Sequence, residues 1–334
     1  MPKGTDVTTT RKHQRLSSDA DARRYTDIRQ LLPDVLNPTP LVRLNRIEVA
    51  SRMETFVKLE WMSPFGSIKD RTARFLVAGL AERGQLDDHQ VIEASSGNTA
   101  IALAALGALD GFRVTTTIPD GVPDEKKIVL RMLVAEVWET PDDVCPVDHP
   151  KDGAIALARS LLVSDESYVM ADQYENLDNI KAHYETTGPE IWAQTEGQVR
   201  WFLAGLGTTG TLTGVGRFLK EQNPSIRIIG VEPGPGHRIP GMKNFDEAKT
   251  PGIADWSVID EIIRVNDEPA YETTKRLWRE EALMVGPSTG AVVAAIEHLD
   301  PSPDDVAVAI SADSGMKYTS YFRDILGNEG IPRT

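Results

Sequence analysis

The chain has a single cysteine, Cys145, among its 334 residues, and 36 lysines and arginines against 50 aspartates and glutamates. One cysteine excludes an internal disulfide and suits a reducing cytoplasm. The residues around Cys145 include no cation or helix start that would activate a thiol, so we expect a structural role for it. The net charge of −14 disfavours nucleic acids and anionic lipid surfaces as partners.

Long apolar runs are also missing. No stretch approaches the ~18 uninterrupted apolar residues of a membrane span. The segment 1–24 is polar and lacks the apolar centre of a secretory signal. We therefore expect a cytoplasmic protein, and its length favours two closely packed lobes.

Short apolar runs alternate with helical patterns along most of the chain. The apolar runs indicate strands at residues 55–59, 90–93, 113–118, 136–139, 168–171, 199–204, 226–231 and 305–311. The helical patterns lie at residues 70–83, 98–109, 123–133, 153–163, 179–192, 211–221, 268–282 and 290–298. Continuously apolar strands are covered on both faces, and strand–helix alternation favours parallel sheets. The sequence therefore predicts an α/β fold with two lobes, each a mostly parallel twisted sheet flanked by helices.

A glycine-rich loop, Gly205–Thr211, follows the predicted strand 199–204 and opens the next helix. Its glycines let successive backbone N–H groups point at one oxyanion, and the helix N-terminus adds its dipole. The loop therefore favours a phosphate ligand. It also satisfies the pattern G-x-G-x-x-G, and Glu232 ends the next strand about 20 residues later. An NAD-dependent dehydrogenase built on Gly205–Gly210 and Glu232 is therefore an alternative.

Lys69 stands where a loop rich in glycine, serine and proline, residues 63–68, turns into the predicted helix 70–83. The unpaired N–H groups and the positive dipole end of a helix start disfavour a second cation. A lysine at this position loses its proton more readily, and the neutral amine is the form that makes a Schiff base with a carbonyl. Lys69 is therefore a candidate for covalent chemistry.

Three further polar loops adjoin predicted strand ends or helix starts: Ser95–Thr99, Gln173–Asn176 and Gly286–Ala291. Hydroxyl and N–H groups at a helix start can hold a carboxylate. A longer segment, residues 232–252, is rich in proline and glycine, and loops of this length commonly cover binding sites. With Lys69, these loops predict a site that binds more than one anionic group.

Seven motifs follow one another in order along residues 37–321. They are Asn37–Leu41, Gly66–Arg71, Ser96–Thr99, Thr186–Ile191, Gly207–Thr211, Gly286–Ala291 and Asp313–Tyr318. In this order and spacing they resemble the pyridoxal-phosphate enzymes of the cysteine synthase and cystathionine β-synthase group. The resemblance implies a fold type II architecture, similar to the tryptophan synthase β chain, with pyridoxal 5′-phosphate as cofactor and no metal. It implies a polar extension 1–24, a smaller mobile substrate-binding lobe 55–172, and a larger cofactor-phosphate-binding lobe of 25–54 plus 173–330.

The resemblance also assigns roles to the matching residues. Lys69 would hold the cofactor as an internal aldimine and serve as the catalytic base. Asn98 would hydrogen-bond the 3′ oxygen of the cofactor, and Ser288 would face its pyridine nitrogen. The cofactor phosphate would be cradled by Gly207, Thr208, Thr209, Gly210 and Thr211. The substrate carboxylate would be bound by Ser95, Ser96, Gly97, Asn98, Thr99 and Gln173.

The implied reaction is β-replacement on an activated L-serine, O-acetylserine or O-phosphoserine. Sulfide would be the nucleophile, and L-cysteine would form through an aminoacrylate intermediate. A neutral hydroxyl at Ser288 leaves the ring nitrogen largely unprotonated, which favours β-elimination over transamination. Lys243 and Arg238, in the segment 232–252, would select O-phosphoserine by its charge; the alternative is that both are solvated surface residues. The resemblance also implies a homodimer.

Alternatives stay open within the same chemistry, because cystathionine or 2,3-diaminopropionate formation would use the same cofactor residues. A non-catalytic scaffold of this fold would be expected to lose Lys69 or Asn98, and both are present. Two positions depart from the usual pattern of the group: Ser95 replaces a threonine, and Ala100 replaces a common glycine. The serine keeps the hydroxyl, whereas we expect Ala100 to narrow the space beside the substrate loop.

Overall fold

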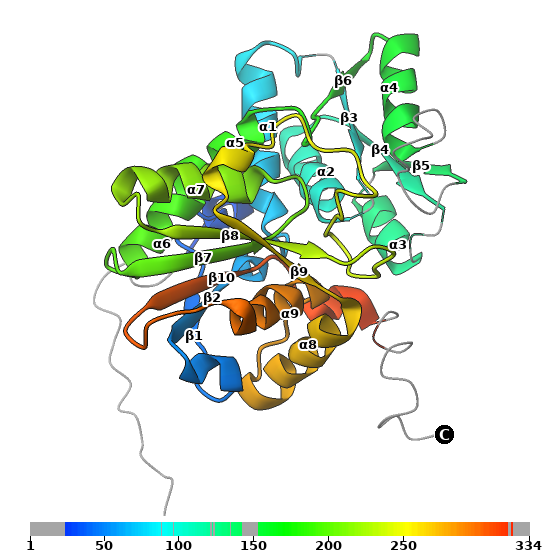
Figure 1. Cartoon of the computed structure of the whole chain (residues 1–334). Coiled ribbons are helices and arrows are strands. Elements are labelled where there is room, and N and C mark those ends of the chain that lie inside the picture. Colours follow the sequence, from blue (N-terminus) through cyan, green and yellow to red (C-terminus); the bar gives the residue numbers. More distant parts are fainter. Residues whose placement is uncertain are drawn as a thin grey trace, which may run out of the picture.

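The protein, seen here as a computed structural model, contains two β-sheets that are each covered by helices (Figure 1). The structure describes residues 24–319 and 322, apart from residues 88, 96, 121, 123, 134 and 142–152. Cys145 and nearly all of the polar extension 1–24 therefore lie outside the described residues. Within the described part of the chain, no helix combines the length and apolar composition that crossing a membrane requires.

The larger sheet has six strands in the order β1-β2-β10-β7-β8-β9. Strand β1 pairs antiparallel with β2, and the other neighbours pair in parallel. The strands span Leu41–Arg43 (β1), Glu54–Leu59 (β2), Val306–Ser311 (β10), Val199–Gly205 (β7), Arg227–Pro233 (β8) and Glu261–Val265 (β9). Every residue of β10 is buried, as expected for a strand covered on both faces.

The smaller sheet has four parallel strands in the order β5-β4-β3-β6. These strands span Glu136–Thr140 (β5), Val114–Pro119 (β4), Gln90–Ala94 (β3) and Tyr168–Met170 (β6). The helices around it are α1 (Lys69–Glu82), α2 (Asn98–Asp110), α3 (Asp124–Met132) and α4 (Ala154–Ser164). All neighbouring strands in the two sheets are therefore parallel except β1 and β2. The predicted α/β fold is confirmed.

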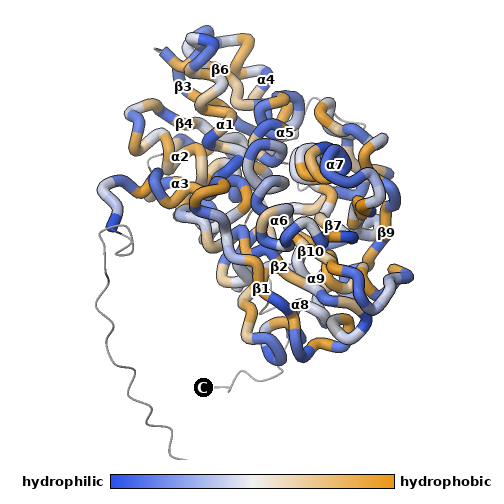
Figure 2. Tube along the Cα trace, turned by 90° about the vertical axis from the view of Figure 1, so that its left-hand side faces the viewer, coloured by the Kyte–Doolittle hydropathy of each residue, from blue (hydrophilic) through white to orange (hydrophobic). Residues whose placement is uncertain are grey.

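Helices cover both faces of the larger sheet (Figure 1). One face carries α5 (Asp178–Ala182), α6 (Gly188–Gln194) and α7 (Gly210–Gln222), and the other carries α8 (Asp267–Glu281) and α9 (Pro287–Ala294). A separate apolar cluster lies on each face of the sheet. Hydrophilic stretches recur around the periphery, as on α7 (Figure 2). Helix α1 contacts α2 beside the smaller sheet and α5 beside the larger sheet, so it lies between the helices of the two sheets.

The lobe boundary expected at residue 55 is wrong for one strand. Strand β2 (Glu54–Leu59) pairs with β1 and β10 in the larger sheet, so the smaller part of the molecule begins after Leu59. The apolar run predicts a strand at this point but does not say which sheet it joins, because its partner β10 comes near the end of the chain. The rest of the proposed division, including the mobility of the smaller lobe, stays a prediction.

Candidate active site

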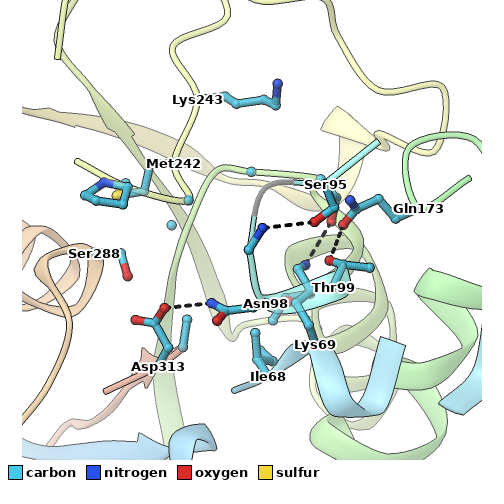
Figure 3. Close-up of a pocket in the computed structure, with 18 of the residues that line it drawn as sticks. Ile68, Lys69, Ser95, Asn98, Thr99, Gln173, Met242, Lys243, Ser288 and Asp313 are labelled. Atoms are coloured by element: carbon cyan, nitrogen blue, oxygen red, sulfur yellow. Dashed lines mark hydrogen bonds between the residues drawn. The ribbon is translucent and has the colours of Figure 1, made fainter. Parts of the chain in front are cut away.

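A cavity of about 410 Å³ opens between the two sheets (Figure 3). It lies at the carboxyl ends of β3, β4, β7 and β10, where parallel α/β sheets bind their ligands. The candidate residues that line it are Lys69, Ser95, Gly97, Asn98, Thr99, Gln173, Gly207, Thr208, Thr209, Thr211, Lys243 and Ser288. The fold therefore brings loops that are far apart in sequence around one cavity.

Three of the candidate residues are not among those that line the cavity. Gly210 begins α7 and packs away from the cavity, because a Cβ on it would meet Asn179 at 2.4 Å. Arg238 is exposed, and its backbone N–H donates to the Asp267 carboxylate. Ser96 lies outside the described residues.

Lys69 is the first residue of α1, and its side chain lines the cavity. Its Nζ donates to the Thr208 hydroxyl at 3.4 Å. Burial lowers the pKa of Lys69 to about 8, and the Glu93 carboxylate acts in the opposite direction. The main cause is therefore desolvation rather than the helix dipole expected from the sequence. A lysine with this pKa holds a usable fraction of neutral amine near neutral pH.

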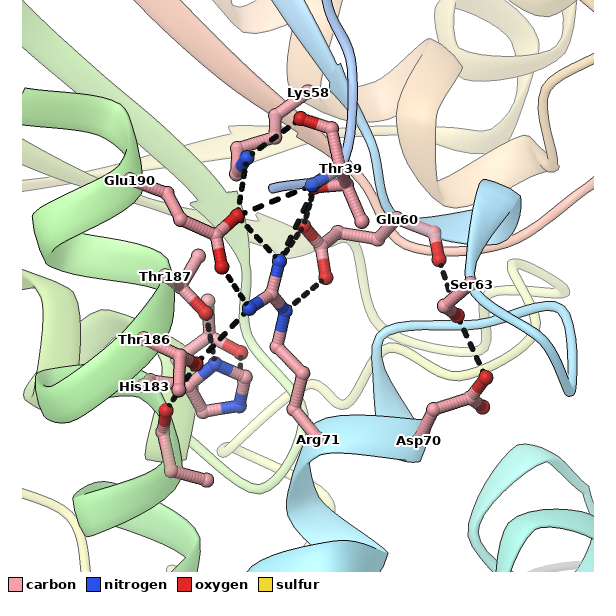
Figure 4. A network of polar contacts seen from close by, with 12 residues as sticks. Thr39, Lys58, Glu60, Ser63, Asp70, Arg71, His183, Thr186, Thr187 and Glu190 are labelled. Atoms are coloured by element: carbon pink, nitrogen blue, oxygen red, sulfur yellow. Dashed lines mark hydrogen bonds and ion pairs between the residues drawn. The ribbon is translucent and has the colours of Figure 1, made fainter. Parts of the chain in front are cut away.

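A buried ion network fixes the start of α1, two residues beyond Lys69 (Figure 4). Arg71 is 1% exposed. Its guanidinium donates to Glu60 through Nε at 2.7 Å and to Glu190 through Nη2 at 2.7 Å. Lys58 pairs with Glu190 at 2.8 Å. Burial would raise the pKa of Glu60, but the charges of Arg71 and Lys58 hold it at about 2. The network ties α1 to the end of β2 and to α6.

The glycine-rich loop wraps the other side of the cavity between β7 and α7. Thr209 has φ of +67°, a left-handed conformation that is uncommon for a β-branched residue. The Thr209 hydroxyl is buried and has no hydrogen-bond partner among the described residues. A Cβ on Gly207 would stand 2.8 Å from the carbonyl oxygen of Gly241. The loop therefore presents an unpaired hydroxyl donor at a helix start, where backbone N–H groups attract an anion.

The proposed carboxylate loop follows β3 and leads into α2. The Ser95 hydroxyl accepts long hydrogen bonds from the backbone N–H groups of Gly97 at 3.5 Å and Ala100 at 3.4 Å. The Thr99 hydroxyl donates to Gln173 Oε1 at 2.7 Å, which fixes the end of the Gln173 amide that faces Thr99. Ala100 is fully buried in the apolar cluster of the smaller sheet and does not line the cavity. The expectation that Ala100 narrows the substrate space is therefore wrong.

Ser288 and Lys243 reach the cavity from the larger sheet. Ser288 lies in the first turn of α9, on the side of the cavity away from Gln173 (Figure 3). The Lys243 ammonium lies 5.0 Å from the centre of the Tyr174 ring. The backbone N–H of Lys243 donates to Leu206 O at 2.8 Å, which joins the long loop to the glycine-rich loop.

Comparisons with known proteins agree with this geometry. Residues 32–313 match the family model described as pyridoxal-phosphate dependent enzyme. The chain belongs to this family. Cysteine synthase B of Escherichia coli (strain K12) is 38% identical over 291 residues, which cover 86% of this chain and 94% of that protein.

Two solved structures are similar to this fold. The crystal structure of an O-ureido-L-serine synthase has a TM-score of 0.82 and 31% identity, and the match covers 92% of this chain and 98% of that one. A hydrogen sulfide-producing enzyme from Fusobacterium nucleatum has a TM-score of 0.78 and 32% identity, and the match covers 88% and 98% of the two chains. These relatives place the chain in the cysteine synthase and cystathionine β-synthase group of fold type II, with pyridoxal 5′-phosphate as cofactor.

The residues present fit this cofactor. A phosphate needs donors at a helix start, and the Thr209 hydroxyl has no partner among the described residues of this enclosed loop. An aldehyde needs an amine, and Lys69 lies within 3.4 Å of the same loop. The hydroxyl and amine groups of the cavity are therefore those needed to bind a phosphorylated carbonyl compound.

The dehydrogenase alternative is wrong. Glu232, which would have met a ribose, instead accepts the Phe245 N–H at 2.9 Å and the Arg264 guanidinium at 2.7 Å. It does not line the cavity. Membership of the pyridoxal-phosphate family accounts for the glycine-rich loop without a dinucleotide.

Several residues around the site carried no recognised sequence signal. Asn179 Nδ2 donates to the Thr208 hydroxyl at 3.0 Å, and His183 Nε2 lies 3.2 Å from the Thr211 hydroxyl. Burial lowers the pKa of His183 to about 3, so its imidazole is neutral. Both stand in the segment 179–192, which the sequence predicts as a single helix. A search for polar residues on the buried face of that segment would have found them.

Proposed function

We propose that this protein catalyses β-replacement on an activated L-serine with sulfide as the nucleophile, giving L-cysteine. The observation that carries the proposal is Lys69, an amine of pKa about 8 that contacts the threonine-rich loop and lines a cavity with four polar loops around it. The similarity to a cysteine synthase along most of both chains supports the same reaction class.

In this proposal, each candidate residue has a defined task. Lys69 would hold the carbonyl carbon of the cofactor, and Gly207–Thr211 would hold its phosphate. Asn98 and Ser288 would face the 3′ oxygen and the ring nitrogen. When bound, the cofactor supplies an electron sink that makes the α-proton of the substrate acidic. The Nζ atom of Lys69 takes that proton and later returns it.

The substrate carboxylate would be held by Ser95–Thr99 and Gln173. Of the described residues in this set, Ser95, Gly97, Asn98, Thr99 and Gln173 line the cavity. This group is fixed by the Thr99–Gln173 hydrogen bond, so the substrate Cβ would project toward the remaining open space. Lys243 lines that space and has a cationic head, which suits a phosphate leaving group. O-phosphoserine is therefore the preferred substrate of this proposal over O-acetylserine.

The test is a product assay. The cofactor-loaded protein is mixed with sulfide and O-phosphoserine, O-acetylserine or serine, and L-cysteine is measured over time. We expect cysteine from O-phosphoserine, and no cysteine from a folded Lys69→Ala variant. Lys243→Ala should raise KM for O-phosphoserine about tenfold or more, because a charged hydrogen bond contributes about 1.5–3 kcal/mol. It should leave KM for O-acetylserine nearly unchanged.

Other outcomes would redirect the proposal. Cysteine from O-acetylserine alone would refute the role of Lys243. Sulfide release from cysteine, without synthesis from either ester, would place the protein beside its hydrogen sulfide-producing relative. Turnover with homocysteine or an amine instead of sulfide would favour cystathionine or 2,3-diaminopropionate formation. A homodimer and a cytoplasmic location belong to the same proposal, and solution mass and cell fractionation test them.

A further inference from the structure

Both ends of the Asn98 amide are held by charged side chains that come from the end of the chain. Asn98 Nδ2 donates to Asp313 Oδ2 at 2.6 Å (Figure 3), and Asn98 Oδ1 accepts from Lys317 Nζ at 2.8 Å. An ammonium can only donate and a carboxylate can only accept, so the amide has one possible orientation. Asn98 is the residue proposed to meet the 3′ oxygen of the cofactor.

Asp313 is buried and Lys317 is half-buried, and further contacts hold both in place. Asp313 is 2% exposed, and it also accepts a hydrogen bond from the Tyr318 hydroxyl. Lys317 donates to Phe65 O at 3.4 Å as well as to Asn98. Burial lowers the pKa of Lys317, and the carboxylates of Asp313 and Asp70 act in the opposite direction. Burying a charge is costly unless partners compensate it, so this arrangement constrains the side chains closely.

The contacts with Asp313 and Lys317 leave one N–H donor of the Asn98 amide unused. The Nδ2 group of Asn98 carries two hydrogens, and Asp313 takes one of them. Asn98 and Asp313 both line the cavity, so the second N–H is available to a ligand there. A rotation of the amide would place its oxygen against the Asp313 carboxylate and its NH₂ group against the Lys317 ammonium. Both contacts would be repulsive.

We propose that Asp313 and Lys317 are positioning residues that lock the Asn98 amide, so that its second N–H meets the 3′ oxygen of the cofactor. This inference rests on the proposed function of the cavity. It assigns to the C-terminal motif a task that acts through Asn98 rather than by direct contact with the cofactor. A fixed donor loses no rotational freedom when the cofactor binds, which strengthens binding.

A double-mutant cycle tests the lock. Cofactor-free wild type, Lys317→Met, Asn98→Ala and the double variant are titrated with pyridoxal 5′-phosphate, and the dissociation constant and visible spectrum of each are recorded. Each single variant should bind the cofactor about tenfold more weakly, the scale of one hydrogen bond to a charged group. The double variant should bind as Asn98→Ala does, because Lys317 acts only through Asn98. Lys317→Arg keeps the N–H donors and should stay within about threefold of wild type.

Each contrary result has a distinct meaning. Wild-type affinity in Lys317→Met, or losses that multiply in the double variant, would overturn the positioning role and leave the proposed function standing. A wild-type protein that forms no coloured complex would overturn the proposed function and this inference together. If Lys317→Met does not fold, as judged by circular dichroism, Asp313→Asn replaces it in the same cycle with the same criteria.

Discussion

Replacing Arg71 by methionine should destabilise the protein strongly, because it removes the centre of the buried ion network. Arg71 makes two hydrogen bonds with Glu60, at 2.7 and 3.0 Å, and its methionine replacement would make none. Glu190 keeps Lys58 at 2.8 Å, whereas Glu60 would lose its guanidinium partner. Removing one partner of a buried ion pair costs about 3–5 kcal/mol. We therefore expect the free energy of unfolding to fall by that amount at pH 7.

The measurement is urea unfolding of the cofactor-free protein, followed by circular dichroism, so that cofactor binding does not contribute. Arg217→Met is a matched control. Arg217 forms an exposed pair with Asp255 at 2.7 Å, and loss of such a pair costs about 0–1 kcal/mol. A loss in Arg71→Met as small as that of this control would refute the reasoning.

The free energy of unfolding should depend on pH differently in the wild type and in Arg71→Met. In the wild type, Glu60 has a pKa of about 2, so its contribution to stability is present above its ordinary value near 4.5 and is lost as the pH falls through about 2. Without Arg71, burial raises the pKa of Glu60 above 4.5, so the variant gains stability by taking up a proton as the pH falls. The difference between the two proteins should therefore shrink toward low pH. Arg71→Met combined with Glu60→Gln should be more stable than Arg71→Met alone at pH 7.

Further predictions concern the cavity. Gly207→Ala should weaken cofactor binding about tenfold or more, since its Cβ would meet the Gly241 carbonyl at 2.8 Å. Gly216→Ala is the control, because its Cβ would make ordinary contacts at 3.4 Å or longer. A titration that gives both variants the same affinity would contradict the steric argument. The rate at which pyridoxal 5′-phosphate combines with the cofactor-free protein should rise with pH through about 8, because the neutral amine of Lys69 increases through its lowered pKa. Stopped-flow absorbance measures this rate, and a midpoint near 10.5 would show an unperturbed lysine.

Much of the fold follows from the sequence pattern, because parallel strands buried on both faces are continuously apolar. The predicted strand 199–204 and helix 211–221 correspond to β7 (Val199–Gly205) and α7 (Gly210–Gln222). The edge strands were missed: β1 has three residues, and in β9 only Ile263 and Val265 are buried. A short strand with one exposed face carries a weak apolar signal.

One predicted helix, 179–192, is divided in the structure. It consists of α5, a π-helical turn at His183–Thr187, and α6. The Thr186 hydroxyl donates to Ala182 O at 2.5 Å within this turn, and His183 contacts the Thr211 hydroxyl below the glycine-rich loop. Such turns depend on tertiary contacts and often stand at functional sites. Sequence periodicity alone does not distinguish them from a continuous helix.

The candidate site was predictable where its residues form local motifs at strand ends. Lys69, Asn98 and the glycine-rich loop all line the cavity as the motifs indicate. The supporting contacts were not predictable, because they join residues that are far apart in the chain. Arg71 with Glu190, and Asn98 with Lys317, are examples, and in each case only the fold shows which partner compensates the buried charge.

Mapping the cofactor attachment site tests the central claim most directly. The coloured protein is reduced with borohydride, digested and analysed by mass spectrometry. The account predicts a phosphopyridoxyl group on the peptide that contains Lys69, and loss of both the visible band and the label in Lys69→Ala. A label on Lys126, Lys243 or Lys317 instead, or no label on a folded protein supplied with the cofactor, would contradict it.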